Sequence, residues 1–345
     1  MAPAVTVLST QSTAPFSADL VDARGTFDVL VRGARLEADQ VMSLELARPD
    51  GGELPGWAPG AHVDLVLPSG RVRQYSLCGD PARRGVYRIA VLREHAGRGG
   101  SAEIHGTALV GRVLSCRPPR NHFELVEASA YVFVAGGIGI TPILPMISAV
   151  AAAARPWRLY YGGRSLRSMA FAREVMAAHA ANVTLWPQDE RGLLDLPGIL
   201  AGAEPDAAVY CCGPEGLLAA TEQACAAAGR TGRLHVERFA QDPVAAAAKA
   251  EPGAETDTAF TVVLRRSGTE LLVPVGRSLL DVVREAVPAI LSDCEEGYCG
   301  TCETQVVDGV PEHRDTVLSD AEKAGNQVMM ICVGRARTPT LVLDL

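Results

Sequence analysis

Four cysteines in the last quarter of the chain are spaced like the ligands of a metal centre. They are Cys294, Cys299, Cys302 and Cys332. The order C-x4-C-x2-C, with a distant fourth cysteine, is typical of thiolates that hold a [2Fe–2S] cluster. Gly297 and Gly300 stand among the first three ligands, where they let the backbone approach the cluster closely. A structural zinc site is the alternative, but such sites usually carry two C-x2-C pairs, and this loop has one.

Two short motifs nearer the N-terminus carry groups suited to a phosphate and a flat ring. In Arg73–Leu77 (RQYSL) the arginine offers a planar cationic fork, the tyrosine a flat face and the serine a hydroxyl. Gly97–Ser101 (GRGGS) precedes a short helical stretch, and such an entry presents free N–H groups to an anion. Each motif alone is weak, because a Tyr-Ser pair in a strand usually serves packing. Together they predict a flavin phosphate site.

A glycine loop in the middle of the chain could let a nucleotide approach the backbone. Gly137-x-Gly139 joins an apolar strand to an alanine-rich helix, but Pro142 stands where the dinucleotide fingerprint has its third glycine. The next strand ends in Gly162–Ser165 and offers no acidic residue for a ribose hydroxyl. The loop is therefore weak evidence for a Rossmann dehydrogenase, although it still suits a pyrophosphate or a nicotinamide.

The elements around the Arg73–Leu77 motif are expected to be short antiparallel strands. Alternating runs separated by Gly, Pro and Asp indicate six strands that fit a small β-barrel. The predicted strands are Phe27–Arg35, Val41–Ala47, His62–Leu67, Arg71–Leu77, Val86–Arg93 and Arg112–Arg117. We assign this flavin-binding barrel to residues 25–128.

Residues 129–240 change to alternating strands and helices, which predicts an open α/β sheet with a nucleotide site at the carboxyl ends of its parallel strands. The expected strands are Tyr131–Ala135, Arg158–Tyr161, Val183–Pro187 and Ala207–Cys212, and the segment Arg233–Phe239 closes the domain. Helices are expected after the glycine loop to about Ala154, over Ser168–His179, and after Pro214 to about Ala228.

The remaining segments are a tail, a linker and a small third domain. Met1–Leu20 has no basic residue and no continuous apolar run, so it is not expected to be a secretory signal, and residues 1–24 are expected to be a loose tail. Residues 241–258 form a linker rich in Ala, Pro and Glu. Residues 259–345 are expected to form a β-grasp domain. Its predicted elements are strands at Thr261–Leu264, Leu271–Val275, Glu303–Val307 and Leu341–Leu343 and a helix at Ser278–Ala286.

Charge and cysteine usage narrow the class of protein. The net charge of −8 argues against nucleic acid as a partner, and no apolar run is long enough for a membrane helix. From Thr258 onward there are 13 acidic against 8 basic residues, which suits either docking to a basic partner or solubility alone. Five scattered cysteines outside the cluster set suggest a reducing cytoplasm. We expect a monomer.

The order of these parts resembles the phthalate dioxygenase reductase family, which includes the reductases of vanillate O-demethylases. The resemblance covers nearly everything after the first two dozen residues. The motifs that carry it are RQYSL, GRGGS, PPRNHFEL at Pro118–Leu125, GGIGITP at Gly136–Pro142, CGP at Cys212–Pro214, the cluster loop CEEGYCGTC, and ICVGRA at Ile331–Ala336. It implies an FMN-binding β-barrel, an α/β NAD(P)-binding domain, and a C-terminal β-grasp domain of the plant-type ferredoxin kind.

The resemblance also implies roles for individual residues. The residues that would hold FMN are Arg73, Tyr75, Ser76, Val91, Arg93, Gly99, Gly100 and Ser101. Phe239 would lie against the flavin ring, and Glu237 matches a family position near it. The residues that would shape the nicotinamide pocket are Gly137, Thr141, Cys212 and Pro214. Arg164 and Ser165 would meet the adenosine end of the nucleotide, and Arg164 would also suit the 2′-phosphate of NADPH. From the residues alone, Cys212 could equally be a small buried strand residue.

The implied activity is that of an oxygenase reductase. NADH would deliver two electrons as hydride to FMN, and the [2Fe–2S] cluster would pass them singly to a terminal oxygenase. Hydride transfer needs no protein acid or base, so none is assigned, and Thr141 and Cys212 mark the transfer region. Two alternatives remain open: a reductase that serves a cytochrome P450, and a redox sensor that does not turn over. The choice of FMN over FAD and of NADH over NADPH rests on the resemblance.

Overall fold

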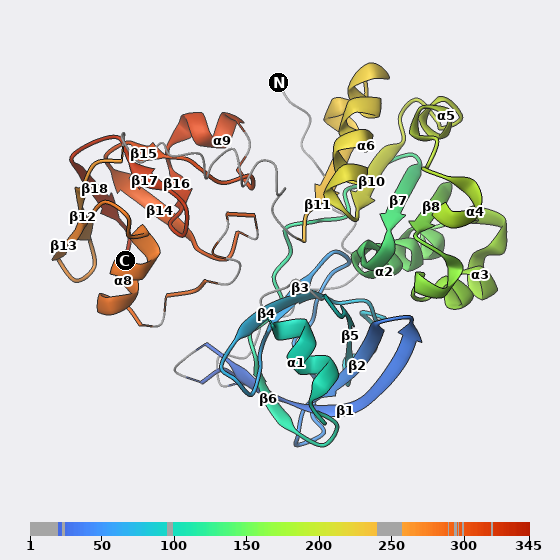
Figure 1. Cartoon of the computed structure of the whole chain (residues 1–345), viewed down its shortest axis with the longest axis horizontal. Coiled ribbons are helices and arrows are strands. Elements are labelled where there is room, and N and C mark those ends of the chain that lie inside the picture. Colours follow the sequence, from blue (N-terminus) through green and yellow to red (C-terminus); the bar gives the residue numbers. More distant parts are fainter. Residues whose placement is uncertain are drawn as a thin grey trace. The chain divides into compact units, whose positions relative to one another are not determined.

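The computed structural model groups the chain into two compact units, up to Glu237 and from Arg238. The first unit contains two sheets and the second contains one larger sheet, and each unit is described by itself (Figure 1). The residues that the structure describes are 20–22, 25–94, 99–239, 257–288, 290–292, 295, 297–298, 300–318 and 320–345. Most of the predicted tail and most of the predicted linker therefore lie outside the described residues.

Six antiparallel strands form the first sheet, in the order β4-β3-β6-β1-β2-β5. Their bounds are β1 Phe27–Ala38, β2 Val41–Ala47, β3 His62–Val66, β4 Val72–Ser76, β5 Tyr87–Leu92 and β6 Val113–Cys116. Backbone pairing of Leu77 with Ile89 joins the two edge strands, so the sheet closes into a barrel. Buried residues alternate with more exposed ones over the first half of β1, where Phe27, Val29 and Val31 point into the barrel core. Helix α1 (Gly100–Gly106) buries Ile104 in that core.

The second sheet is parallel and has the order β11-β10-β7-β8-β9. Its strands are β7 Tyr131–Gly136, β8 Trp157–Gly163, β9 Val183–Pro187, β10 Ala208–Cys212 and β11 Leu234–Glu237. Its helices are α2 Ile140–Ala152, α3 Ala172–His179, α4 Gln188–Arg191, α5 Leu196–Ala201 and α6 Glu215–Ala227. Strands β7 and β10 are buried along their whole length, because helices cover both faces of the sheet.

The two faces of this sheet pack against different helices. On one face, α2 and α3 cover Phe133, Tyr161 and Cys212, and this core continues into the barrel. On the other face, α5 and α6 cover Val134 and Cys211 (Figure 1). Neighbouring strand residues point to opposite faces, so Cys211 and Cys212 belong to separate cores.

The second unit contains a mixed sheet in the order β13-β12-β18-β14-β16. The strands are β12 Phe260–Leu264, β13 Thr269–Val273, β14 Glu303–Asp308, β16 Val328–Met330 and β18 Thr340–Leu343, with a short pair β15 Pro311–Glu312 and β17 Arg335–Ala336. Helix α8 (Leu279–Ala286) begins where the Ser278 hydroxyl accepts a hydrogen bond from the Asp281 N–H, and its apolar side packs into the core. Helix α9 spans Asp320–Gly325.

Two predicted elements are displaced in the structure. The helix expected from Ser168 begins at Ala172, because Leu166–Ser168 forms a separate 3-10 turn and Phe171 adopts left-handed backbone with φ 59°. The strand expected at Leu271–Val275 lies at Thr269–Val273, because the turn before it ends at Gly268, with φ +67°. Among the residues that the structure describes, no helix is both long and apolar enough to cross a membrane.

Candidate functional site

Strand β4 and the start of α1 lie against each other on the barrel. Gly99 immediately precedes the helix and has φ 85°, a left-handed backbone conformation that favours glycine. A Cβ on Gly100 would lie 2.6 Å from the Arg73 Nε, so a larger residue there would displace the Arg73 side chain. The structure therefore brings the RQYSL strand and the GRGGS segment together. Gly97 and Arg98 lie outside the described residues.

The other predicted flavin residues lie on or beside the neighbouring strands. Ser76 is buried, and Tyr75 is half-buried against the barrel core. The Val91 carbonyl lies 2.9 Å from the His105 Nε2 of α1, and Arg93 is exposed just beyond β5. The Ser101 hydroxyl accepts a 3.1 Å bond from the Glu94 N–H, which ties the end of β5 to the start of α1.

Replacing Arg73 with glutamine is expected to weaken FMN binding about 10- to 100-fold, because a hydrogen bond to a charged group contributes about 1.5–3 kcal/mol. Titration of flavin-free protein with FMN, followed by flavin fluorescence, measures the affinity. Arg48→Gln is the matched control, since Arg48 pairs with Asp50 elsewhere on the barrel. Equal FMN affinities for wild type and Arg73→Gln would exclude this role for Arg73.

The carboxyl ends of the adjacent parallel strands β7 and β10 form the edge at which a nucleotide is predicted to bind, called the nucleotide edge below. Residue Ala135 of β7 pairs with Cys212 of β10, so the loops after these two strands meet. A Cβ on Gly139 would lie 2.2 Å from the Cys212 carbonyl oxygen, and one on Gly136 would lie 2.7 Å from the Pro214 Cδ. The GGIGITP and CGP motifs are thus packed backbone to backbone. This leaves an edge lined by main chain, which suits close approach of a nucleotide.

Two hydroxyl groups fix the glycine loop from within. The buried Thr141 hydroxyl donates a 2.9 Å bond to the Ile138 carbonyl, so its oxygen is left to accept from another donor. The buried Tyr161 hydroxyl lies 3.0 Å from the carbonyls of both Gly137 and Ala170, which share its one proton. Gly137 itself has φ 54°, a conformation that favours glycine. Tyr161 thus holds the predicted nucleotide loop, although no motif in the sequence identifies it.

Arg164 and Ser165 lie at the same edge, directly after β8. Arg164 is exposed, as a group that meets an adenosine phosphate or ribose must be. Ser165 caps the 3-10 turn that follows and exchanges hydrogen bonds with Ser168. Its position therefore also has a purely structural reason.

Cys212 and Glu237 form a neutral pair where β10 and β11 end. They face each other in the strand register, and the Cys212 thiol lies 4.0 Å from the Glu237 Oε2. Burial raises the pKa of Cys212 well above its ordinary value, and the Glu237 charge raises it further. Glu237 as a residue is half-buried, and burial of its carboxyl raises its pKa from 4.5 to about 8. Both groups therefore keep their protons at neutral pH.

The second unit holds the described part of the cysteine set. Cys302 and Cys332 are buried in its core, 4% and 7% exposed. Gly297 and Gly300 have φ 76° and 75°, which L-residues rarely adopt. A Cβ on Gly297 would lie 2.6 Å from the Val333 Cγ2, so the loop is pressed against the segment that carries Cys332. Cys294 and Cys299 lie outside the described residues.

Helix α8 anchors this loop through an ion pair. Arg284 Nη2 donates bonds of 2.6 Å to Glu295 and 2.8 Å to Ser292, the residues on either side of the first predicted ligand region. The Gly297 carbonyl accepts a 2.9 Å bond from the Thr316 N–H. The loop is therefore held from two elements, which a cluster-binding loop requires.

These residues fit the cofactors that the motifs predict. Buried cysteine sulfurs beside left-handed glycines suit an iron–sulfur cluster, and the Gly139–Cys212 contact suits a nucleotide. The Arg73–Gly100 contact likewise suits a phosphate. Phe239 is exposed and belongs to the second unit, so its role against the flavin stays a prediction. His235 stacks on Tyr210 with ring centroids 4.6 Å apart, a structural role.

Two family models match the chain. Residues 262–337 match the 2Fe-2S iron-sulfur cluster binding domain. Residues 133–223 match the oxidoreductase NAD-binding domain. The first match contains the cysteine loop and the second contains the glycine loop.

The chain is similar to several characterised proteins along nearly all of its length. It is 43% identical to the phenoxybenzoate dioxygenase subunit beta of Ectopseudomonas oleovorans, over 89% of this chain and 94% of that protein. The solved structure of a phthalate dioxygenase reductase, described as modular for electron transfer from pyridine nucleotides to [2Fe-2S], matches with 36% identity and a TM-score of 0.67. That match covers 93% of this chain and 98% of the other.

A self-sufficient cytochrome P450 monooxygenase of type IV also matches, with 41% identity and a TM-score of 0.83. That match covers 93% of this chain but only 41% of the P450 protein, so the chain spans about two-fifths of that longer polypeptide.

Proposed function

Because this chain belongs to the phthalate dioxygenase reductase family, we propose that it passes electrons from NADH, through FMN and a [2Fe–2S] cluster, to a Rieske-type terminal oxygenase. Membership confirms the predicted class of enzyme, an NAD(P)H-dependent oxidoreductase, and the predicted cofactors, FMN, NAD and a [2Fe–2S] cluster. It also confirms the multidomain fold class. The identity of the acceptor, the preference for NADH and the residue roles belong to the proposal.

One observation supports the proposal. The Arg73–Gly100 contact, the close packing of Gly139 on Cys212 and the buried Cys302 and Cys332, each predicted to serve a different cofactor, all occur on one chain. Bound FMN supplies the change from two-electron to one-electron chemistry, because a flavin is stable with zero, one or two added electrons. The residues of the chain would bind the flavin and the nicotinamide nucleotide and orient them toward each other. Arg73 and the start of α1 would hold the flavin phosphate, and the loops after β7 and β10 would position the nicotinamide.

The neutral Cys212–Glu237 pair suits this task. An ionised carboxylate at the nucleotide edge would repel the pyrophosphate, whereas a protonated one does not. Free thiols at Cys78, Cys116 and Cys225 are consistent with the reducing cytoplasm that we propose as its compartment, where it would act as a monomer.

The acceptor can be identified by mixing the NADH-reduced protein, without oxygen, with a candidate Rieske-type oxygenase. We expect the Rieske cluster of that oxygenase to be reduced within one turnover. The similarity to a P450 fusion supports a second candidate, in which the acceptor is a P450 haem. Rapid haem reduction with no reduction of a Rieske cluster would favour that candidate and overturn the first.

The wild-type protein is expected to lose folding stability as the pH rises, because Glu237 is buried, and replacing Glu237 with glutamine should remove this loss. Between pH 4.5 and about 8, the unfolded chain releases a proton that the folded carboxyl keeps, so folding becomes less favourable as pH rises. The loss is at most about 1.4 kcal/mol per pH unit. Glutamine stays neutral, so the stability gain of the variant over wild type should be small at pH 5 and should grow toward pH 8, where the variant should unfold at a clearly higher temperature.

Thermal unfolding of the FMN-loaded protein at four pH values from 5 to 8 measures this effect. Asp206→Asn is the matched control, because that carboxyl is 71% exposed and paired with Arg233. A difference between Glu237→Gln and wild type that stays constant over this range would contradict the shifted pKa.

A further inference from the structure

The barrel and the nucleotide sheet share one apolar core within the first unit. Val41, Cys78 and Ala90 of the barrel belong to the same core as Ile143 and the other buried side chains of α2. The contact between the two sheets is therefore packed, as a protein interior is. A small shift at this contact would be transmitted to the groups that each sheet presents.

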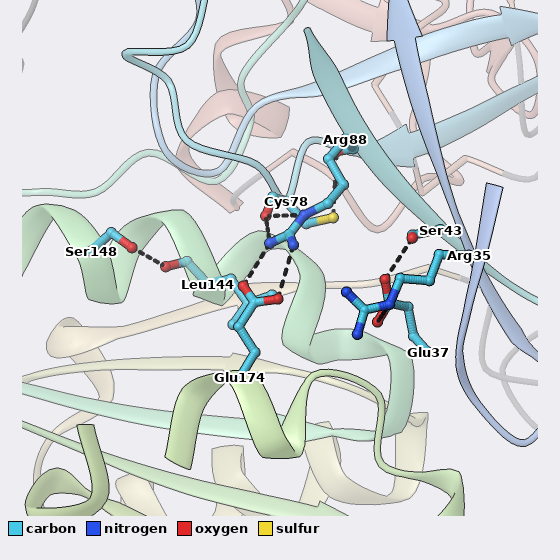
Figure 2. A network of polar contacts seen from close by, with 8 residues as sticks. All are labelled: Arg35, Glu37, Ser43, Cys78, Arg88, Leu144, Ser148 and Glu174. Atoms are coloured by element: carbon cyan, nitrogen blue, oxygen red, sulfur yellow. Dashed lines mark hydrogen bonds and ion pairs between the residues drawn. The ribbon is translucent and has the colours of Figure 1, made fainter. Parts of the chain in front are cut away.

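A charged pair lies at the edge of this core. Arg88 of β5 donates bonds of 2.9 and 2.8 Å to the two carboxylate oxygens of Glu174, on α3 (Figure 2). The same guanidinium lies over the ring of Phe171, 4.9 Å from its centroid. The Arg88 side chain is 24% exposed and that of Glu174 is 47% exposed. The pair is bidentate, which fixes the direction of α3 as well as its distance from the barrel.

On the barrel side, Arg88 is bonded to Cys78, just beyond the end of β4, the strand that carries Arg73, Tyr75 and Ser76 and is called the flavin strand below. Its Nε and Nη2 donate bonds of 3.3 and 2.8 Å to the Cys78 carbonyl, as Figure 2 shows. Cys78 in turn donates its N–H to the Arg88 carbonyl at 2.8 Å. It follows Ser76 by two residues, and Ser76 is the hydroxyl that we assign to the flavin. The position of Arg88 and that of Ser76 are therefore linked through a short, bonded stretch of backbone.

On the nucleotide side, the residues that Arg88 contacts lead to the glycine loop. Phe171 is buried, caps the start of α3 and follows Ala170. The Ala170 carbonyl is one of the two that share the Tyr161 hydroxyl, and the other belongs to Gly137. A continuous series of direct contacts thus runs from the flavin strand, through Arg88 and α3, to the loop assigned to the nicotinamide.

We propose that Arg88 and Glu174 are positioning residues for hydride transfer, which set the glycine loop of the nucleotide sheet against the flavin strand of the barrel. Neither side chain touches a cofactor in this assignment; they act through Cys78 on one side and Phe171 on the other. The inference rests on the proposed transfer of hydride from NADH to FMN. It does not depend on the identity of the electron acceptor.

The test uses the full-length holoprotein and the variants Arg88→Met, Glu174→Gln and the double variant. Flavin bleaching after anaerobic mixing with saturating NADH gives the rate of hydride transfer, and NADH deuterated at C4 shows that this step is being observed. We expect each single variant to be slowed about 10- to 100-fold, because a misplacement near 1 Å can cost that much. The double variant should be no slower than the worse single variant, since both remove one contact. Tyr161→Phe, which cuts the same series elsewhere, should also slow the bleaching.

Asp39→Asn is the matched control. An ion pair between Asp39 and Arg167 also joins the barrel to the nucleotide sheet, with 3.0 Å between the Arg167 Nε and the Asp39 Oδ2. The side chain of Asp39 is 54% exposed and that of Arg167 is 82% exposed. This variant should bleach at the wild-type rate. If FMN-loaded Arg88→Met and Glu174→Gln lose thermal stability but bleach at the wild-type rate, the pair is only structural and the proposal fails. Glu174→Gln keeps the Arg88–Cys78 bonds and serves if Arg88→Met does not fold. Failure of the wild type itself to bleach would instead overturn the proposed function.

Discussion

Replacing Cys302 with serine is expected to abolish electron delivery to the oxygenase while NADH-dependent reduction of a small dye continues. The reason is that serine offers a hard, protonated oxygen where the cluster needs a soft thiolate. Cys302 lies in the core of the second unit, whereas the predicted flavin strand and the nucleotide edge lie in the first unit. The loss should therefore be confined to the final one-electron step. Iron content, the visible spectrum and the two activities measure it.

Cys225→Ser is the matched control for this experiment. Cys225 is as deeply buried, on α6 of the nucleotide sheet, and belongs to no proposed ligand set. Cys299→Ser, at a ligand outside the described residues, is expected to behave as Cys302→Ser does. If Cys302→Ser kept its flavin and fold yet lost dye reduction too, the cluster would not follow the flavin in the order of electron flow.

Replacing Gly139 with alanine is expected to abolish NADH-dependent flavin reduction. The new Cβ would lie 2.2 Å from the Cys212 carbonyl oxygen and 2.6 Å from the Gly213 nitrogen, and neither backbone atom can move away without displacing the loop. The two loops of the nucleotide edge would separate, and the nicotinamide would lose its position. A misplacement of this size corresponds to a rate loss of about 100-fold or more. Stopped-flow bleaching by NADH measures the rate, and flavin absorbance gives the FMN content.

The flavin site should survive in Gly139→Ala, because Arg73 and Gly100 belong to the barrel. Gly216→Ala is the control, since a Cβ there meets no atom within 4 Å and α6 gains a better helix former. Normal bleaching by NADH in Gly139→Ala would show that the close packing of the two loops is unimportant for nucleotide binding.

Strands with clear alternation or clear boundaries could be predicted from the sequence. The strands Val41–Ala47 and Val183–Pro187 have the bounds that their patterns indicate, because turn-forming or polar residues flank both. Very short elements carry too few residues for a periodic pattern. The helix Gln188–Arg191 and the strand Val328–Met330 were therefore not predicted. For Leu196–Ala201 the signals are confined to its start, where the Asp195 side chain caps the helix and Pro197 stands in its first turn.

The residues of the candidate site likewise fall into those that a local motif identifies and those that only the packing of the fold brings together. Glycines and cysteines could be identified because their spacing along the chain reflects a local requirement. The contact of Gly139 with Cys212 joins two such motifs through the sheet register, which the strand order allows but no single motif states. Arg88 and Glu174 are 86 positions apart, and neither lies in a motif, so their pairing depends on how two sheets pack. The same holds for Tyr161, which looks like any aromatic strand residue.

Anaerobic titration of the holoprotein with NADH, followed by absorbance and by electron paramagnetic resonance, tests the central claim most directly. The proposed order of electron flow predicts that the flavin bleaches and that the signal of a reduced [2Fe–2S] cluster appears, whereas protein stripped of FMN shows no cluster signal with NADH. Reduction of the cluster without FMN, or a cluster that stays oxidised beside a fully reduced flavin, would contradict it.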